Sequence, residues 1–481
     1  MEAWGGRAID AYPEYQRGER LEAENLYPIA HFWWYTPEGL AQQQAEKGTR
    51  RRLVDTARFL HETQNAFYAR FAAAIRATGY RGALVGSCWQ AGSGVPHYLN
   101  LRADALVGLV DRHNYWAGGA GNHVLAPGPV EAEAMVSHPG SGLLATGFQQ
   151  VAGRPFSLSE WISRLPNEWI AEGPPIVAAY GLGLQGWDAS FSFASNLPGE
   201  PDRVDAPNVY DADAPTQLGL SPALARMVYR GDAREGEVVA VRRISLPELA
   251  EGRLGFAESV EQAGDAKTIH GELPAEALAV GRVLVDFVEH QEPTRPPTLA
   301  RWWSPGAASV VSTTRQLAWS TAGRGSFTVD TAGTQGVVGF AGGRSIALGD
   351  VTIALDTPFA VVLVTSLDRE RGIRDAPRLL VTVVARARNT GMRYSADGAR
   401  LEAVGGPPIL LEGVRAAISL RRAGEPVVSA LDAGGRRTER RPVVSRTGAG
   451  AGFVADGARD RTLYYEVSYE ADAGRPPAGR P

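Results

Sequence analysis

The first half of the chain combines one long helical pattern with several short apolar runs. Between residues 49 and 79, apolar side chains recur every three or four positions among Arg and Glu, and the pattern ends at Gly79. This spacing predicts a long amphipathic helix, because residues three and four apart share one helix face. Continuous apolar runs, which are typical of parallel strands buried on both faces, follow at 82–87, 105–110, 155–158 and 182–193.

Helical segments separate some of these runs, and another helix follows the last one. Residues 174–180 have a helical pattern, and residues 221–231 start with a serine cap and end in a glycine. Strands that alternate with helices indicate β/α units and a parallel sheet. The four predicted strands are half of the eight that a closed β/α barrel needs.

The pattern changes in the second half of the chain. Residues 236–300 contain short mixed segments that end in a proline-rich stretch, and we interpret them as a connecting region. From 301 to 470, short strands separated by Gly, Asp and Pro turns predict a β-sandwich domain. Residues 471–481 are expected to form a disordered tail. The clearest of the predicted strands lie at 326–329, 336–340, 359–365, 378–385 and 463–467.

Composition argues against several classes of partner. The formal net charge is −4 and no basic stripe interleaves with aromatic residues, so we expect no nucleic-acid partner. No apolar run approaches the roughly 18–20 residues that cross a bilayer, so we expect no membrane partner. Cys88 is the only cysteine, which excludes an intrachain disulfide and a cysteine-based metal site. The first residues lack the pattern of a signal peptide, and the compartment stays open.

Polar and aromatic residues follow each of the four predicted strands. In β/α barrels the active site is built at the carboxyl ends of the strands. Strand ends rich in Trp, His, Tyr and Glu therefore indicate a site, since ordinary turns would contain Gly, Asn or Asp. These residues are Trp89 after the first run, Asp111, His113, Asn114 and Tyr115 after the second, Glu160 and Trp161 after the third, and Trp187 after the fourth.

The sequence around these ends resembles the clan A glycoside hydrolases. The similarity rests on Pro-Phe-Ser-Leu-Ser-Glu-Trp at 155–161 and on Gln-Gly-Trp-Asp at 185–188, which look like the last two β/α units of that clan. It extends over most of residues 50–470 to a bacterial group of cellulase-like or β-galactosidase-like proteins. The resemblance implies the C-terminal half of a (β/α)8 TIM barrel, strands five to eight, in residues 1–235, followed by a β-sandwich domain.

The resemblance also implies roles for the residues at the strand ends. Glu160 would be the catalytic nucleophile, and His113 and Tyr115 would line the sugar subsite or orient the nucleophile. Residues 86–89 are Gly-Ser-Cys-Trp, where related sequences often have Gly-Ser-Asn-Trp. The resemblance therefore implies no polar role for Cys88. The remaining implied roles are sugar contacts for Trp89, Trp161 and Trp187, and support for Asp111 and Asn114.

Each of these roles has a structural alternative. Glu160 could cap a turn or pair with an arginine, and His113 could be an ordinary hydrogen-bonded core histidine. Trp89 and Trp187 could simply pack at the mouth of a barrel. We favour the site interpretation for Glu160 because of its strand-end position and its aromatic neighbours.

The implied reaction is hydrolysis of an O-glycosidic bond by a retaining double displacement. It needs two carboxyl groups about 5–5.5 Å apart and no cofactor or metal. In this clan the acid/base is a Glu, typically in Asn-Glu, that ends the fourth strand. No strand ending in Asn-Glu precedes the helix at 49–79. We therefore expect the acid/base and the first four strands to lie upstream of Met1, so that this chain is a fragment acting on an oligo- or polysaccharide.

Two rival functions and one physical consequence follow. The chain could be a non-catalytic carbohydrate-binding or structural protein, whereas an esterase would need a Ser–His–acid arrangement that these motifs do not supply. Half a barrel exposes its sheet edges, which is an aggregation hazard. We therefore expect poor solubility, or self-association through these edges, unless residues 1–49 cover them.

Overall fold

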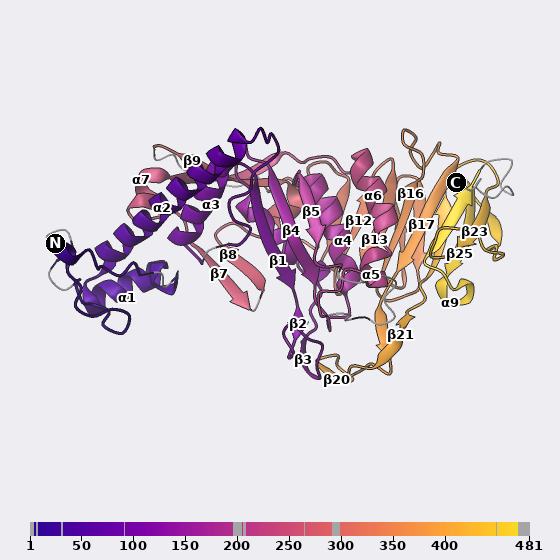
Figure 1. Ribbon diagram of the computed structural model, residues 1–481. Helices are drawn as coiled ribbons and strands as arrows, with labels where there is room; N and C mark the ends of the chain where they lie inside the picture. Colours follow the sequence, from indigo (N-terminus) through magenta and orange to yellow (C-terminus); the bar gives the residue numbers. More distant parts are fainter. Residues whose placement is uncertain are drawn as a thin grey trace.

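The computed structural model describes residues 4–5, 8–29, 32–90, 92–195, 204, 208–263, 265–290, 299–448 and 450–469. Figure 1 shows a helical N-terminal region, a middle region of strands and helices, and a C-terminal region of strands. Within the described ranges, no helix combines the length and the apolar character that crossing a membrane requires.

The long amphipathic helix predicted at 49–79 is present as α2 (Arg50–Ala77), which follows α1 (Pro37–Lys47). Its first turns are buried, where Leu53 and Val54 pack with apolar side chains from residues 12–40. From residue 58 onward, no side chain of α2 is buried. The described residues before α2 therefore cover the start of this helix.

A five-stranded sheet forms the middle region, in the order β5-β4-β1-β8-β7. The first four of these strands run parallel to their neighbours, and β7 is antiparallel to β8. A two-stranded parallel pair, β6 and β9, lies beside this sheet (Figure 1). The strands of the main sheet are β1 (Val110–Trp116), β4 (Phe156–Ser163), β5 (Ala189–Ser192), β7 (Glu258–Ala263) and β8 (Ala266–Gly271).

Of the four predicted parallel strands, the one at 155–158 is the start of β4, and the other three differ from the observed strands. Residues 82–87 form only an isolated parallel bridge between Val85 and Leu109. Residues 105–107 are the end of α3 (Val95–Val107), and β1 starts only at Val110. The run at 182–193 begins in a helix that continues to Leu184. The reason is that a short apolar run fits a buried helix as well as a buried strand.

The expected helices are present with small differences. The segment 174–180 lies within α4 (Gly173–Ile176) and the π-helical η6 (Val177–Leu184). The helix at 221–231 is α6 (Ser221–Arg230), which ends at Gly231 in the left-handed conformation that favours glycine. The hydroxyl of Ser221 does not cap it, because Leu220 occupies the cap position. Shorter helical segments are η1 (Leu21–Ala23), η2 (Phe32–Tyr35), η3 (Met135–Ser137), η4 (Gly142–Gln149), η5 (Ile170–Glu172) and α5 (Pro215–Leu218).

Residues 236–300, expected to be a connecting region, are instead a structural part of the middle region. Their strand β8 lies beside β1, on the edge where the strand predicted at 82–87 should have continued the sheet. Val283, Val285 and Leu278 from this segment lie in the same buried core as β1 and β4. Its elements are β6 (Val238–Ser245), α7 (Leu246–Ala250), β7, β8, α8 (Ala277–Val280) and β9 (Arg282–Val288). The sequence hides this role because these elements are short and carry many charged residues. Among the described residues the strands close into no barrel.

The C-terminal region contains two antiparallel sheets that share one hydrophobic core, to which Val362 and Val381 contribute from one sheet and Ile353 and Ile418 from the other. All five strands named from the sequence at 326–467 are present, with ends shifted by one or two residues. The larger sheet is β10 (Ser309–Val311), β11 (Leu317–Ser320), β12 (Ser326–Asp330), β13 (Thr334–Gly339), β16 (Ala360–Ser366), β17 (Arg378–Val384), β26 (Tyr464–Ser468) and β23 (Val427–Leu431). The smaller is β14 (Arg344–Ala347), β15 (Val351–Leu355), β22 (Arg415–Leu420), β25 (Gly450–Asp456) and β24 (Val444–Thr447).

The middle and C-terminal regions pack tightly against each other. Tyr180 of η6 lies with its ring 5.0 Å from Trp319 and 5.3 Å from Phe327, and all three are buried in one core. A small mixed sheet adds a backbone link, because β20 of the C-terminal region pairs with β3 of the middle region. The small elements are β2 (Gly118–Gly119), β3 (Gly128–Glu131), β18 (Ala387–Thr390), β19 (Arg393–Tyr394), β20 (Arg400–Ala403), β21 (Gly406–Leu411) and α9 (Gly457–Asp460).

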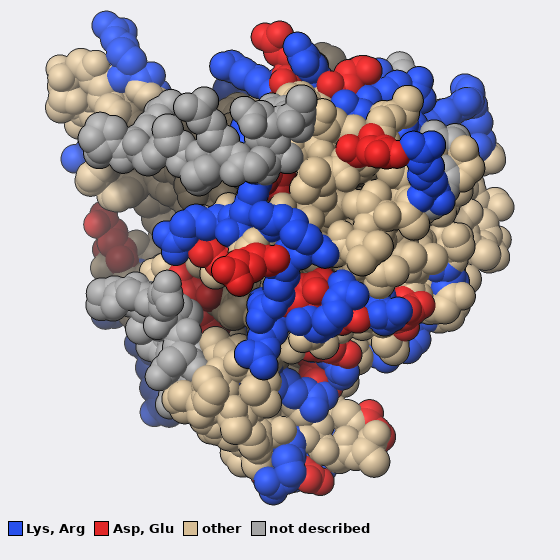
Figure 2. Space-filling model, turned by 90° about the vertical axis from the view of Figure 1, so that its right-hand side faces the viewer, with Lys and Arg blue, Asp and Glu red and all other residues tan. Residues whose placement is uncertain are grey.

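The face of the molecule at the C-terminal end carries charges of both signs. Figure 2 shows blue Lys and Arg side chains next to red Asp and Glu side chains, without a stripe of one sign. Ion pairs such as Arg415 with Asp456 and Arg446 with Glu425 account for part of this pattern. This mixed face does not have the single-sign field that nucleic-acid-binding surfaces present.

A fully buried ion pair joins the sheet to α3. The guanidinium of Arg112 on β1 donates to Asp104 at 2.8 Å and to Gln149 at 2.6 Å, and both side chains of the ion pair are completely inaccessible. Asp104 also accepts hydrogen bonds from the backbone and hydroxyl of Ser87. Removing one member of such a pair leaves an uncompensated charge in the core.

We therefore expect Asp104→Ala to lower the free energy of unfolding by about 3–5 kcal/mol. The measurement is urea denaturation of the full chain, followed by far-UV circular dichroism. The control is Glu62→Ala, which removes an exposed pair with Arg58 on α2 and should leave stability nearly unchanged. Equal effects of the two variants would contradict the structural role of the buried pair.

Candidate functional site

The predicted site around Glu160 lies on β4, where the strand contains one extra residue. The pairing of β1 with β4 passes from Leu158 directly to Glu160, so Ser159 has no partner on β1. A β-bulge of this kind interrupts the alternation of side chains between the two faces of a sheet. As a result, neighbouring Ser159 and Glu160 both contact side chains on the same face of β1.

The carboxylate of Glu160 contacts two residues of β1. The hydroxyl of Tyr115 donates to Oε2 of Glu160 at 2.7 Å, and Nδ1 of His113 lies 3.1 Å from the same oxygen. Burial raises the pKa of Tyr115, and the hydrogen bond to Glu160 raises it further, so the phenol stays a donor. The Glu160 side chain is 34% exposed, which leaves its carboxylate reachable from solvent.

Asp111 and two serines form the base of this arrangement. The buried carboxylate of Asp111 accepts hydrogen bonds from Ser157 and, at 2.5 Å, from Ser159. Because the single hydroxyl proton of Ser159 goes to Asp111, its oxygen is an acceptor for Nε2 of His113, 3.1 Å away.

The two ring nitrogens of His113 therefore both face acceptors. Its Nε2 faces Ser159 and its Nδ1 faces Glu160. Burial lowers the pKa of His113, whereas the charges of Glu160 and Asp111 act in the opposite direction.

Lys267 on β8 is a buried cation that sequence reasoning missed. Its Nζ donates to the backbone carbonyl of His113 at 3.1 Å and lies 3.3 Å from the ring centre of Trp89. Burial, and next the positive charge of Arg112, lower the pKa of Lys267 to about 7. Its segment of short, charged strands has no apolar run that would have pointed to a buried lysine.

Trp89 and Cys88 lie at the other side of the same arrangement. The Trp89 ring meets His113 edge-to-face with 6.0 Å between ring centres, as a site residue next to Glu160 should. Its neighbour Cys88 is half-buried, and burial together with the charge of Asp111 raises the pKa of the thiol. A thiol with a raised pKa is a poor nucleophile.

A second polar group that the sequence did not indicate adjoins Tyr115. The ring of Tyr210 lies 5.1 Å from that of Tyr115, edge-to-face, and its hydroxyl contacts Asp265 and His123. Arg164 lies 3.9 Å from the Asp265 carboxylate. Burial raises the pKa of Tyr210 to about 12, and the hydrogen bond to Asp265 contributes to this shift.

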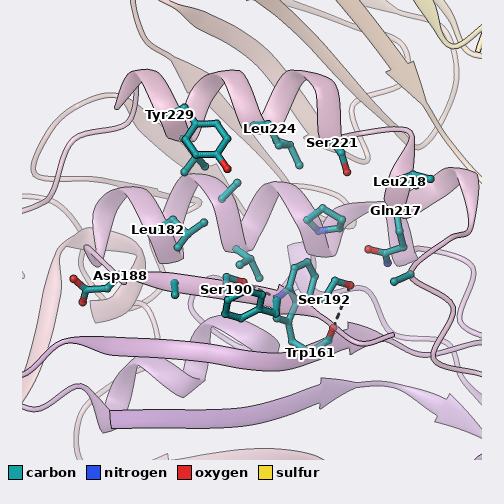
Figure 3. A pocket seen from close by; sticks show the side chains of 18 residues that line it. Trp161, Leu182, Asp188, Ser190, Ser192, Gln217, Leu218, Ser221, Leu224 and Tyr229 are labelled. Carbon is teal, nitrogen blue, oxygen red and sulfur yellow. Dashed lines mark hydrogen bonds between the residues drawn. The ribbon is translucent and has the colours of Figure 1, made fainter. Parts of the chain in front are cut away.

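The other predicted site residues lie elsewhere, and two of them require correction. Trp161 points to the opposite face of the sheet from Glu160, donates to Ser190 at 2.6 Å, and lines a groove between β5 and α6 (Figure 3). Trp187 is buried against Phe156 in the core. Trp161 directly follows Glu160, and successive residues of a strand point to opposite faces of the sheet. Trp187 lies before β5 and not at its carboxyl end, because η6 continues to Leu184 and the strand starts only at Ala189.

Asn114 has the supporting role expected of it. Its side-chain oxygen accepts the backbone N–H of Lys267 at 2.9 Å, and its amide donates to the carbonyl of Gly142 at 3.1 Å. It therefore joins β1 to β8 and to η4.

The immediate partners of Glu160 come from β1. The hydrogen-bond and ion-pair partners of Glu160 are Tyr115 and His113, and no carboxylic acid is among them. The described part of the chain also contains no group of three His, Cys, Asp or Glu residues suited to a metal ion. Comparison with protein-family models, with curated proteins and with solved structures finds no match for this chain.

The shifted pKa of Lys267 predicts how stability depends on pH. Between pH 7 and its ordinary value of 10.5, Lys267 is neutral in the folded chain and protonated in the unfolded one. The unfolded state then binds more protons, so stability should rise with pH. Between about pH 7.5 and 9.5 the wild type should gain up to about 1.4 kcal/mol per pH unit relative to Lys267→Met.

This prediction is measured by urea denaturation at several pH values. Lys47→Met is the matched control, since that lysine lies partly exposed on α1 and should leave the wild-type slope intact. Parallel curves for the wild type and Lys267→Met would contradict a neutral buried amine.

Proposed function

We propose that this chain carries the nucleophile part of a retaining glycoside hydrolase, with Glu160 as the nucleophile. The observation that supports this best is a partly exposed carboxylate that accepts a hydrogen bond from Tyr115 and has His113 against the same oxygen. These two contacts at one oxygen hold the other oxygen in a defined direction.

In the proposed reaction, an oxygen of Glu160 attacks the anomeric carbon of a glycoside. The bond to the leaving oxygen breaks, that oxygen takes a proton from an acid, and a glycosyl ester forms on Glu160. Water then attacks the anomeric carbon and loses a proton to the conjugate base of that acid, which frees the carboxylate of Glu160. Tyr115 donates to Glu160 and His113 lies against the same oxygen, so that both side chains orient the carboxylate throughout.

We propose that the acid of this reaction is a residue that does not contact Glu160. We keep the half-barrel interpretation as part of this proposal, because β1, β4 and β5 are parallel and adjacent, with helices between β4 and β5. The place of β8 beside β1 departs from that interpretation. The two-sheet C-terminal region is proposed to be the β-sandwich that buttresses the site or binds carbohydrate.

The aromatic residues limit how a sugar could bind. Trp89 is the tryptophan next to Glu160, and Lys267 already occupies one face of its ring. A pyranose could then stack only on the opposite face.

A non-catalytic carbohydrate-binding protein is the second candidate. The observation in its favour is that no carboxylic acid is among the contacts of Glu160. Such a protein would bind a sugar at the same face without forming a covalent intermediate.

The decisive experiment uses substrates whose leaving group needs no acid. The full chain is incubated with a panel of 2,4-dinitrophenyl 2-deoxy-2-fluoroglycosides, because dinitrophenolate departs without protonation and the fluorine slows release of the glycosyl-enzyme. We expect dinitrophenol release of at most one equivalent, and a glycosylated peptide that contains Glu160 in the mass spectrum.

The matched variants are Glu160→Gln and Glu133→Gln. Glu133 is an exposed glutamate that pairs with His138 and should leave the labelling unchanged. Glu160→Gln should lower labelling by about 10³-fold or more. Sugar binding without labelling would favour the non-catalytic candidate, and label on another residue would refute Glu160 as the nucleophile.

A further inference from the structure

The edge of the main sheet at β5 borders an apolar groove on the face opposite Glu160. The groove has a volume of about 410 Å³ and runs along the whole of β5 under α6 (Figure 3). Its walls are mostly apolar, with Trp161, Leu182, Leu224 and Val228 among its residues. Among the described residues no strand pairs with the outer edge of β5.

Large apolar side chains project from the rim of this groove. Phe191 of β5 is 63% exposed, Tyr229 of α6 is 91% exposed, and Leu218 is 55% exposed. Contiguous apolar patches of this kind mark interaction sites on soluble proteins. An exposed edge strand with unpaired backbone groups adds a template for pairing with another strand.

One polar group inside the groove also lacks a partner. Gln217 is 4% exposed, and its side-chain nitrogen donates to the carbonyl of Ile170. Its Oε1, however, is buried without a hydrogen bond. A buried acceptor without a partner costs free energy, which a donor entering the groove would recover.

Charge distinguishes this surface from the second apolar surface of the chain. Among the described residues that line the groove, Asp188 is the only charged one, and its carboxylate accepts the backbone N–H of Phe156. The exposed apolar side of α2, with Phe67 and Phe71, instead shares its helix with the exposed residues Arg58, Arg70 and Arg76. Two copies that met along α2 would bring several arginines together, whereas α6 adds one exposed arginine, Arg226, beside the β5 groove.

We propose that the chain forms a two-fold symmetric dimer in which β5 of each copy pairs with β5 of the other. A symmetric interface needs a self-complementary patch. This patch has both a projection and a recess, because Phe191 and Tyr229 project from the rim of the groove of one copy and can enter the groove of the other copy. Antiparallel pairing of the two edges would join the two sheets into one and bury both unpaired edges.

The first test is sedimentation velocity of the full chain at micromolar concentration. We expect a species of about twice the 51.4 kDa mass of the chain. Phe191→Lys should shift the protein to monomer and raise the dimer dissociation constant at least about 10-fold. The matched control is Phe71→Lys, an equally exposed phenylalanine on α2, which should leave the dimer intact.

A second measurement covers the case in which Phe191→Lys impairs folding. Phe191→Cys and Phe71→Cys are made separately in a Cys88→Ser background, so that each protein has one cysteine. Mild oxidation should link only the first variant into a covalent dimer, because only β5 meets its own copy. A wild type that stays monomeric, or a dimer that Phe71→Lys breaks and Phe191→Lys does not, would overturn the proposal.

Discussion

Ser159, the extra residue of β4, determines which side chains meet at the site. In a regular strand, Ser159 and Glu160 would point to opposite faces, and Trp161 would lie on the face of Ser159. With the bulge, Ser159 accepts from His113 while Glu160 accepts from Tyr115, and Trp161 turns into the groove on the other side. The bulge leaves one residue of β4 unpaired and places a serine and a carboxylate on the same face of the sheet.

The site also depends on the order of its buried charges. Arg112 neutralises Asp104 beneath the sheet, and Asp111 is held by the hydroxyls of Ser157 and Ser159 above it. Glu160 and His113 lie against each other near Lys267, whose pKa burial has lowered to about 7. A protonated Lys267 would be a second buried positive charge near Arg112 with little water to solvate it, so the neutral amine is favoured.

The sequence predicted the residues of the site better than it predicted their surroundings. Glu160, His113 and Tyr115 could be found because polar and aromatic residues gather just after apolar runs, although the run before β1 is partly the end of a helix. The bulge could not be found, since its single extra residue leaves no mark in an apolar pattern. Trp161 was placed on the wrong face because it directly follows Glu160, and successive strand residues point to opposite faces. Lys267 and Asp265 could not be found because they reach β1 through a pairing between segments about 150 residues apart. The strands of the C-terminal region were easier to predict from the sequence, since the turns between them are local and rich in glycine.

The two ends of the main sheet differ in a way that bears on association. At the β7 end, an antiparallel strand closes the parallel sheet, and Glu258 of β7 is bound by Tyr98 and Arg242, so the last strand is anchored by buried charges. At the β5 end, the last described strand has four residues, a solvent-exposed phenylalanine and an open groove beneath it. This edge has neither the charges nor the prolines by which many monomeric sheets avoid pairing, and its shortness is the one such feature that it has. The asymmetry between the two ends is therefore a reason to place the contact between copies at β5.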